Sequence, residues 1–271
     1  MWFTENQTPS VRLGLKVKSI LHQATTPYQE LMVAETDAYG RMLVLDGAVQ
    51  TTVMDEFVYH EMITHVPLMI HPHPQRMGII GGGDGGAVRE ALKHPSVEQV
   101  HLVEIDAEVV RQAKRYFPEI SVELDNPRTQ VHCTDGIEWV RQARDLDVLV
   151  VDSTDPVGPA VGLFQPEFYQ SVADCLGEEG VMVAQSESPF LEPEVIQMVV
   201  QGMRTVFPVV RLYLAAIPTY PSGFWSFTLG SKGPLPGPAD LSRAKFATRY
   251  WTPAIHEAAF ALPQFVEDLI R

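Results

Sequence analysis

The pattern of apolar and polar positions divides the chain into two parts. From residue 13 to residue 53, partly alternating runs are interrupted by turn pairs such as Tyr39-Gly40 and Asp46-Gly47, which is typical of short antiparallel strands. A sheet this small is not stable alone, so we expect it to pack on the rest of the chain or to pair with another copy. Residues 54–70 then predict a helix. Apolar side chains recur there at helical spacing, at Phe57, Val58, Met62, Ile63 and Val66.

Beyond Arg76, apolar runs of strand length alternate with helical patterns. We expect strands at 76–80, 97–106, 129–135, 146–153 and 180–188, and helices at 86–94, 107–117, 136–144, 166–176 and 192–207. This alternation predicts an α/β fold with a doubly wound, mainly parallel, Rossmann-like sheet covered on both faces. Residues 209–218 and 224–231 are separated only by TYPSG, too short for a helical crossover, and predict an antiparallel hairpin at one edge. We therefore expect a small N-terminal antiparallel β domain over 1–54 and a Rossmann-like domain over 55–271.

A glycine-rich loop, IIGGGDGGAVRE, follows the first strand of the larger sheet from Ile79 to Glu90. Gly81, Gly83 and Gly86 match the spacing G-x-G-x-x-G. Glu104 ends the next strand, where an acid can bind ribose hydroxyls. The glycine spacing alone is weak, because such a turn can serve only close packing of strand and helix. The ordered sequence of strand, loop, helix, strand and acid favours a nucleoside site.

Asp84 lies in the middle of this loop, where dinucleotide-binding loops present backbone N–H groups to pyrophosphate. A carboxylate about 4 Å from a phosphate charge would cost about 4 kcal/mol near a protein surface. We therefore expect a nucleoside that carries positive charge and no phosphate, such as a sulfonium nucleoside. Asp84 can also cap the following helix, and the two roles are compatible. Asp135 and Gly136 end the third strand, where an aspartate can accept a hydrogen bond from an adenine amino group.

The fourth strand ends in VLVVDSTDPVGPA, which contains Asp152 and Asp155. Because ligands bind beyond the carboxyl ends of parallel strands, Asp152 is expected to face the same crevice as Asp84. Carboxylates gathered in a partly dry pocket need cations, either a metal or a multiply charged amine. A metal would need a denser set of oxygen or histidine ligands, so we expect none. Candidate neighbours that suit an alkyl diamine are Tyr59, His60 and Tyr220, since rings line methylene groups and attract ammonium; core packing explains Tyr59 equally well.

Composition narrows the class of partner. The formal net charge is −14 and 45% of the residues are hydrophobic, so the chain repels nucleic acid and anionic membranes and attracts small cations. Cys133 and Cys175 lie far apart and form no CxxC pair, which favours a reducing compartment. The start MWFTENQTPS does not resemble a signal peptide, and no apolar stretch is long enough to span a bilayer. We expect a cytoplasmic protein.

Several longer stretches resemble the spermidine synthase family of aminopropyltransferases. They are YGRMLVLDGAVQTTVMDEFVYHEMITHVPL, IIGGGDGGAVREALKHPSVEQVHLVEID, VVDSTDPVGPA, LFQPEFY and IPTYPSGFWSFTLGSK. The resemblance covers nearly the whole chain and is far more specific than the glycine spacing. It implies transfer of the aminopropyl group of decarboxylated S-adenosylmethionine to putrescine, giving spermidine and methylthioadenosine. It also implies direct displacement without a cofactor, in a homodimer or a dimer of dimers.

The same resemblance assigns roles to individual residues. The nucleoside would be held by Gln29, Glu104, Asp135, Gly136 and Pro159. Asp84 and Asp152 would hold the aminopropyl ammonium of the donor, and Asp152 would be the proton acceptor. The acceptor amine would be bound by Gln50, Tyr59, His60, Asp84, Asp152, Asp155 and Tyr220. Residues 156–163 would form a loop that closes over the substrates.

Other functions remain open from the residues alone. A methyltransferase that uses intact S-adenosylmethionine shares this class I methyltransferase type of sheet, and an NAD-dependent oxidoreductase shares the glycine spacing; Asp84 argues against both. A non-catalytic polyamine-binding protein would keep the acidic residues but lose the reaction geometry. The acceptor could also be agmatine or cadaverine, because His60 replaces the glutamine of some relatives and can carry a charge near pH 7.

Overall fold

The computed structural model describes residues 1–154, 158–233 and 243–271, and for residues 158 and 159 only the backbone. Its first part is an antiparallel sheet whose five strands follow one another in chain order. The strands are β1 (Trp2–Asn6), β2 (Arg12–Thr25), β3 (Glu30–Thr36), β4 (Arg41–Leu45) and β5 (Ala48–Thr52). β1 pairs with β2, with Trp2 opposite Lys16, and is a strand that the hydrophobic pattern did not predict.

The second sheet has seven strands in the order β11-β12-β10-β9-β6-β7-β8. Its parallel strands are β6 (Arg76–Gly81), β7 (Gln99–Glu104), β8 (Thr129–Cys133), β9 (Leu146–Asp152) and β10 (Leu176–Gln185). β11 (Val209–Ala216) and β12 (Phe224–Ser231) form an antiparallel hairpin, and β12 also pairs antiparallel with β10. The predicted fold is confirmed: a Rossmann-like sheet with an edge hairpin, preceded by a small antiparallel sheet.

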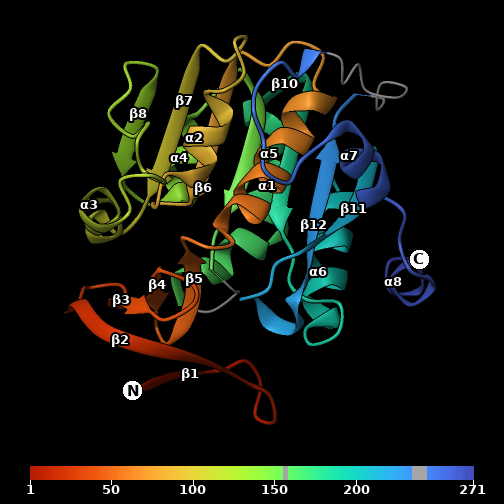
Figure 1. Ribbon diagram of the computed structural model, residues 1–271. Coiled ribbons are helices and arrows are strands. Elements are labelled where there is room, and N and C mark those ends of the chain that lie inside the picture. The colour runs from red at the N-terminus through yellow and green to blue at the C-terminus, as the bar shows by residue number, and fades with distance from the viewer. Residues whose placement is uncertain (155–157, 234–242) are drawn as a thin grey trace.

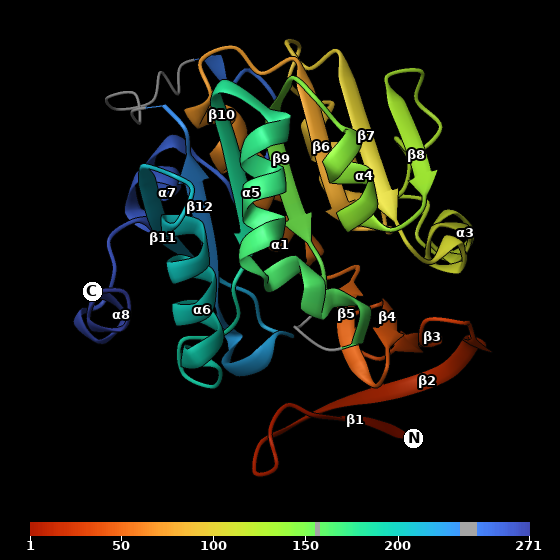
Figure 2. The ribbon, with the colours of Figure 1, turned by 180° about the vertical axis from the view of Figure 1, so that it is seen from behind.

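Helices cover both faces of the second sheet (Figures 1 and 2). One face carries α1 (Glu56–Ile70), α2 (Gly86–Ala91) and α7 (Pro253–Ala259), and the other carries α4 (Gly136–Gln142), α5 (Pro166–Cys175) and α6 (Pro193–Arg204). The remaining helices are α3 (Ala107–Tyr116), α8 (Gln264–Leu269) and the short 3-10 turns η1 (Gly158–Phe164) and η2 (Pro221–Gly223). Within the described ranges, no helix is both long enough and apolar enough to cross a membrane.

Alternate residues of the central strands belong to two separate hydrophobic cores, because successive side chains of a strand point to opposite faces of the sheet. On β6, Ile79 belongs to the core beneath α1 and α2, whereas its neighbour Ile80 belongs to the core beneath α4 and α5. On β9, Val150 and Val151 divide in the same way. Burial on both faces explains why these strands are almost continuously apolar.

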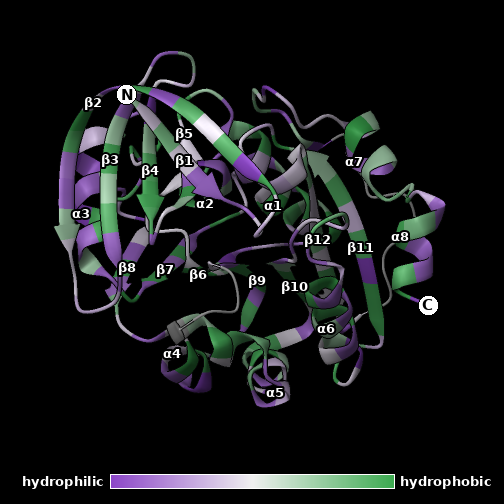
Figure 3. Cartoon of the chain, turned by 90° about the horizontal axis from the view of Figure 1, so that it is seen from below, coloured by the Kyte–Doolittle hydropathy of each residue, from purple (hydrophilic) through white to green (hydrophobic). Residues whose placement is uncertain are grey.

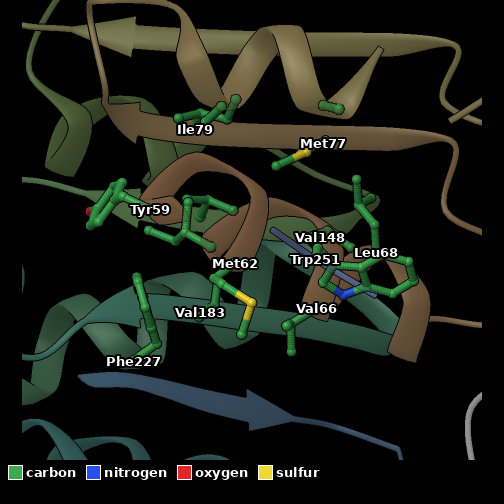
Figure 4. Close-up of a cluster of buried hydrophobic side chains, with 14 of the residues drawn as sticks. Tyr59, Met62, Val66, Leu68, Met77, Ile79, Val148, Val183, Phe227 and Trp251 are labelled. Carbon is green, nitrogen blue, oxygen red and sulfur yellow. The ribbon is translucent and has the colours of Figure 1, made fainter. Parts of the chain in front are cut away.

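Helix α1 runs through the first of these cores. Figure 4 shows Tyr59, Met62 and Val66 among side chains from β6, β9, β10 and β12. Every residue of α1 except Phe57 is buried, and this includes two glutamates and two histidines, Glu56, His60, Glu61 and His65. Buried polar groups are costly unless they are paired, so each of these four side chains must find a partner inside the protein.

The N-terminal sheet lies at the carboxyl ends of the parallel strands (Figures 1 and 3). It is fixed there by its own apolar face, since Leu31 and Leu43 form one buried cluster with Val109 and Phe117 at the two ends of α3. The loops that end β6, β7, β8 and β9 are therefore covered by a second layer of structure, and the space between the two layers is the candidate site.

Candidate active site

The candidate site is a cavity of about 430 Å³ between the N-terminal sheet and the carboxyl ends of β6, β7, β8 and β9. Ten of the predicted site residues line it, namely Gln29, Gln50, Tyr59, His60, Asp84, Glu104, Asp135, Gly136, Asp152 and Tyr220. Asp155 lies outside the described residues. Pro159 lies in η1, where only its backbone is described. The structure thus gathers these predicted residues in one pocket, and their roles toward a ligand stay predictions.

Glycine is required in this loop both by the backbone conformation and by the acidic side chains that lie against it. Gly81 and Gly82 have φ angles of 80° and 63°, which favour glycine. A Cβ atom at Gly82 would also strike the Asp152 carboxylate, and one at Gly83 would lie 2.7 Å from an oxygen of Glu104. The close approach that glycine permits in this loop therefore makes room for carboxylates.

Asp84 is held on the helix side of this loop. Its Oδ1 accepts a hydrogen bond of 2.8 Å from the backbone N–H of Gly86, at the start of α2. The N-cap position itself is occupied by Gly85, whose φ angle is 86°. Asp84 is 7% exposed and lines the cavity. The capping interpretation and the ligand interpretation are therefore compatible.

Glu104 ends β7 and lines the pocket. Its Oε1 accepts a 2.9 Å hydrogen bond from the backbone N–H of Asp106. Burial raises the pKa of Glu104 to about 7. Asp106 in turn accepts a 2.9 Å hydrogen bond from the side chain of Gln29, which joins this part of the pocket to the N-terminal layer. A buried carboxyl at the end of β7 suits ribose hydroxyls, which would satisfy its oxygens.

Asp135 and Gly136 lie at the start of α4, beyond the end of β8. Asp135 is the N-cap residue of α4, where its Oδ1 accepts a 2.7 Å hydrogen bond from the backbone N–H of Ile137. A Cβ atom at Gly136 would clash with Ile80, so glycine lets α4 begin close to the sheet. The two residues therefore have structural roles in addition to the predicted contact with a base.

Asp152 ends β9 and faces the middle of the cavity. Tyr59 of α1 donates a 2.5 Å hydrogen bond to Asp152 Oδ1. Burial and the neighbouring charge of Asp84 raise the pKa of Asp152 to about 6, although His60 and the Tyr59 hydroxyl oppose the shift. Burial, together with the Asp152 charge, holds the pKa of Tyr59 well above its usual value. Tyr59 is therefore a neutral donor that orients a carboxylate, and both face the pocket.

The second half of the pocket is lined by aromatic rings. The rings of Tyr59 and Tyr220 lie 5.4 Å apart, and Trp225 packs on Tyr220 at 4.8 Å. The Tyr220 hydroxyl donates a 2.7 Å hydrogen bond to the backbone oxygen of Gln50. This contact ties the η2 turn to the N-terminal layer, so that both layers shape one aromatic channel.

Sequence reasoning missed two carboxylates near this pocket. Glu5 of β1 lines it, is 6% exposed and accepts a 2.9 Å hydrogen bond from the backbone N–H of Val49. Glu56 does not line the pocket, but its Oε2 lies 2.5 Å from His60 Nδ1. An acid in an edge strand and an acid in the first turn of a helix are both ordinary at exposed positions. Only the tertiary structure shows that these two are buried.

Comparisons with known proteins agree with this architecture. A family model for the Spermine/spermidine synthase domain matches residues 56–236, and one for the Spermidine synthase tetramerisation domain matches residues 1–53. The polyamine aminopropyltransferases of Caldicellulosiruptor bescii and Moorella thermoacetica are each 54% identical to the chain over its full length, which covers 98% and 96% of those proteins.

Solved structures show the same relationship. A spermidine synthase in complex with the transition state analogue AdoDATO has a TM-score of 0.96 and 38% sequence identity, and the spermidine synthase of Thermotoga maritima has a TM-score of 0.95 and 38% identity. Each match covers 100% of this chain and 94% of the other. The chain therefore belongs to the spermine/spermidine synthase family and is an aminopropyltransferase of polyamine biosynthesis.

Proposed function

We propose that this chain transfers the aminopropyl group of decarboxylated S-adenosylmethionine to putrescine, with spermidine and methylthioadenosine as products. The observation that carries the proposal is that Asp84 and Asp152 line one pocket together with Glu104, the glycine loop and the rings of Tyr59, Tyr220 and Trp225. A cationic nucleoside and a diamine together match the charges and surfaces of this pocket.

The donor is selected by charge. Asp84 is buried and its pKa is held below the usual value, because His60 and the Gly86 N–H outweigh the effect of burial. A fixed carboxylate at this position attracts the bare aminopropyl ammonium of the decarboxylated donor. It repels the carboxylate that intact S-adenosylmethionine carries next to its amino group. Asp84 thereby discriminates between two ligands that share the same adenosine and sulfonium groups.

The acceptor lies along the aromatic channel. Tyr59, Tyr220 and Trp225 line the methylene chain and attract ammonium groups. Asp152 binds the amine that attacks. Glu5 lines the same cavity at the N-terminal layer and supplies a second carboxylate for the distal ammonium. Two acids in a pocket that is also lined by aromatic rings favour a diamine over a monoamine.

The reaction is a direct displacement at the carbon next to the sulfonium, so it needs no cofactor and no covalent enzyme intermediate. The attacking nitrogen must first lose a proton. An aliphatic ammonium has a pKa near 10.4, and the pKa of Asp152 is about 6, so transfer between them is uphill by about 6 kcal/mol. Desolvation of the amine narrows this gap. Asp152 accepts the proton in this scheme, but its larger contribution is to hold the nitrogen in line with the carbon.

The assembly and the compartment follow from the same proposal. Relatives carry a domain named for tetramerisation, matched here by residues 1–53, and we propose a homodimer or a dimer of dimers built through the N-terminal sheets. Cys133 and Cys175 are both free thiols, which supports a cytoplasmic enzyme.

The test is a product assay with the purified protein. Putrescine, cadaverine or agmatine is incubated with the decarboxylated donor or with intact S-adenosylmethionine, and the products are followed by mass spectrometry. We expect spermidine and methylthioadenosine from putrescine and the decarboxylated donor alone. Faster turnover of agmatine or cadaverine would mean that this amine, and not putrescine, is the acceptor, while the proposed aminopropyl transfer would stand. Methylated amine from intact S-adenosylmethionine would overturn the proposal, and so would tight binding of polyamine without any product.

A further inference from the structure

Glu56 is a buried carboxylate that does not line the pocket but touches a residue that does. It lies in the first turn of α1, four residues before His60, and is 6% exposed. Its Oε2 lies 2.5 Å from His60 Nδ1. Arg89 of α2 holds the same carboxylate with two hydrogen bonds, 2.8 Å to Oε2 and 3.1 Å to Oε1. Glu56 therefore cannot turn away from His60 without losing its bond to Arg89.

His60 lies between two carboxylates. While Nδ1 faces Glu56, Nε2 lies 3.3 Å from Asp84 Oδ2, and the ring is 3% exposed. A Cβ atom at Gly86 would clash with this ring, so the loop fixes it on a second side. Both ring nitrogens must donate if both carboxylates are to be satisfied, and only the imidazolium has two N–H groups.

We propose that Glu56 is a positioning residue: it keeps His60 as an imidazolium whose Nε2–H is directed at Asp84, and thereby fixes the orientation and the effective charge of the carboxylate that binds the donor ammonium. The inference rests on the proposed function of the pocket and concerns how its charge is set.

The charges around His60 agree with this assignment. On α1 the ring faces Glu56 and lies edge-on to Tyr59. From the other elements it faces Asp84 of the glycine loop and the charge of Asp152 at the end of β9, while Arg89 reaches it only through Glu56. Burial lowers the pKa of His60, but Asp84 and Glu56 together raise it well above its usual value.

The imidazolium limits the negative charge that the pocket presents. Asp84 and Asp152 carry two negative charges, and His60 cancels part of one. Without Glu56, His60 would be neutral at high pH, and Asp84 would act with its full charge. The amine would then bind at least as tightly, but it would hold its proton more strongly and attack more slowly. The expected result is a lower kcat without a higher KM for putrescine.

The experiment compares E56Q with wild type from pH 6 to pH 9, using putrescine and the decarboxylated donor. The kcat of E56Q is expected to lie within about threefold of the wild-type kcat at pH 6. At pH 9, where His60 of the variant has lost its proton, it should fall to about one tenth of the wild-type kcat. H60Q and E56Q/H60Q carry no imidazole here, so their ratios to wild type should not change with pH. A pH-independent ratio for E56Q would overturn the inference.

A matched control is available in Glu90, a second buried glutamate that binds a histidine and Arg89. Its Oε2 lies 3.0 Å from His65 Nε2, and its Oε1 accepts a 2.8 Å hydrogen bond from Arg89 Nε. Neither Glu90 nor His65 lines the pocket. E90Q should lower the melting temperature while its kcat ratio to wild type stays constant with pH. If E56Q behaves like E90Q, Glu56 has only a structural role.

A second measurement does not depend on activity or on the stability of any variant. Protein labelled with ¹⁵N in its histidine rings is examined by NMR at pH 8, with H60Q used to assign the signal of His60. Both ring nitrogens are expected at imidazolium shifts in the wild type, and a neutral ring would overturn the inference. If the wild-type enzyme made no spermidine, the proposed function would fail while this measurement still decided the state of His60.

Discussion

Two buried networks lie one turn apart along α1 and use the same residue types with opposite results. The pocket-side network joins Glu56, His60 and Asp84. The second network joins His65, Glu90 and His94; we call it tail-side, because its histidine rings pack against the C-terminal segment 246–251. Arg89 binds a glutamate of each. Nevertheless, the pKa of His60 is raised well above its usual value, whereas the pKa of His65 is lowered.

The ratio of carboxylates to cations explains the difference. Burial lowers the pKa of both histidines. His60 has two carboxylates within 3.3 Å, one on each ring nitrogen. His65 has one, Glu90, which Arg89 and Lys93 already neutralise, and its other nitrogen faces His94. The pocket side therefore keeps an unbalanced negative charge for a ligand, while the tail side is neutralised within the protein.

The largest expected effect is on the pocket side, at Asp152. D152N keeps the shape of the side chain but cannot accept a proton or attract the amine. We expect kcat to fall about 10³-fold, within the range found for the loss of a proton acceptor. The measurement is steady-state kinetics with putrescine and the decarboxylated donor. A fall of less than about tenfold would mean that the amine is deprotonated elsewhere.

The stability of D152N provides an internal control. The folded-state pKa of Asp152 is raised to about 6 from its usual value of 3.8, so the ionised group costs stability increasingly as pH rises through this interval and fully above pH 6. At pH 7.5 the substitution should therefore raise the melting temperature, by roughly 2–4 °C for each kcal/mol relieved. The gain should shrink toward pH 5. A lower melting temperature at pH 7.5 would show that activity fell because the fold was damaged.

On the tail side, the largest effect is expected at Glu61. Its buried carboxylate accepts backbone hydrogen bonds of 2.7 Å from Arg249, 2.8 Å from Tyr250 and 2.7 Å from Trp251. E61Q replaces one accepting oxygen by a donor that faces N–H groups, so we expect the free energy of unfolding to fall by about 2–3 kcal/mol. Denaturant titration measures this, and kcat at 25 °C should stay within about twofold. A large loss of kcat in folded E61Q would contradict the separation of the two sides.

The sequence predicts these two sides unequally. The parallel sheet and its edge hairpin were predictable because strand and helix periods alternate and TYPSG is too short for a crossover. The pocket acids Asp84, Glu104 and Asp152 were predictable because each ends a parallel strand or lies in the loop after one. Glu5, Glu56 and Glu90 were not, since a glutamate in an edge strand or in a helix is usually solvated. Their burial depends on contacts with segments distant in the chain, which no local period encodes.

A smaller effect is expected for donor discrimination at Asp84. D84N removes the charge that, as we propose, attracts the aminopropyl ammonium and repels the carboxylate of intact S-adenosylmethionine. We expect the ratio of the inhibition constant of intact S-adenosylmethionine to the KM of the decarboxylated donor to fall about 30-fold, which corresponds to about 2 kcal/mol. E90Q is the control, because it also removes a buried negative charge but not from the pocket. An unchanged ratio in D84N would assign selectivity to another residue.

The smallest effect concerns acid stability and tests the tail side. Burial and His65 lower the folded-state pKa of His94 to about 3, whereas in the unfolded chain it is near 6.5. Between these values only the unfolded chain binds the proton, so this contribution to stability is complete above pH 6.5 and is lost as pH falls toward 3. From pH 7 to pH 5.5 the loss amounts to about 1 kcal/mol. H94Q cannot titrate, so its unfolding free energy should decrease by that much less over the same interval, measured by denaturant titration at both pH values. His60 has the opposite sign, because its raised pKa adds stability that is lost only as pH rises. H60Q lacks this contribution, which grows as pH falls from 7 to 5.5, so its acid decrease should be larger than that of wild type. Equal curves for H94Q and wild type would mean that His94 is already protonated in the fold.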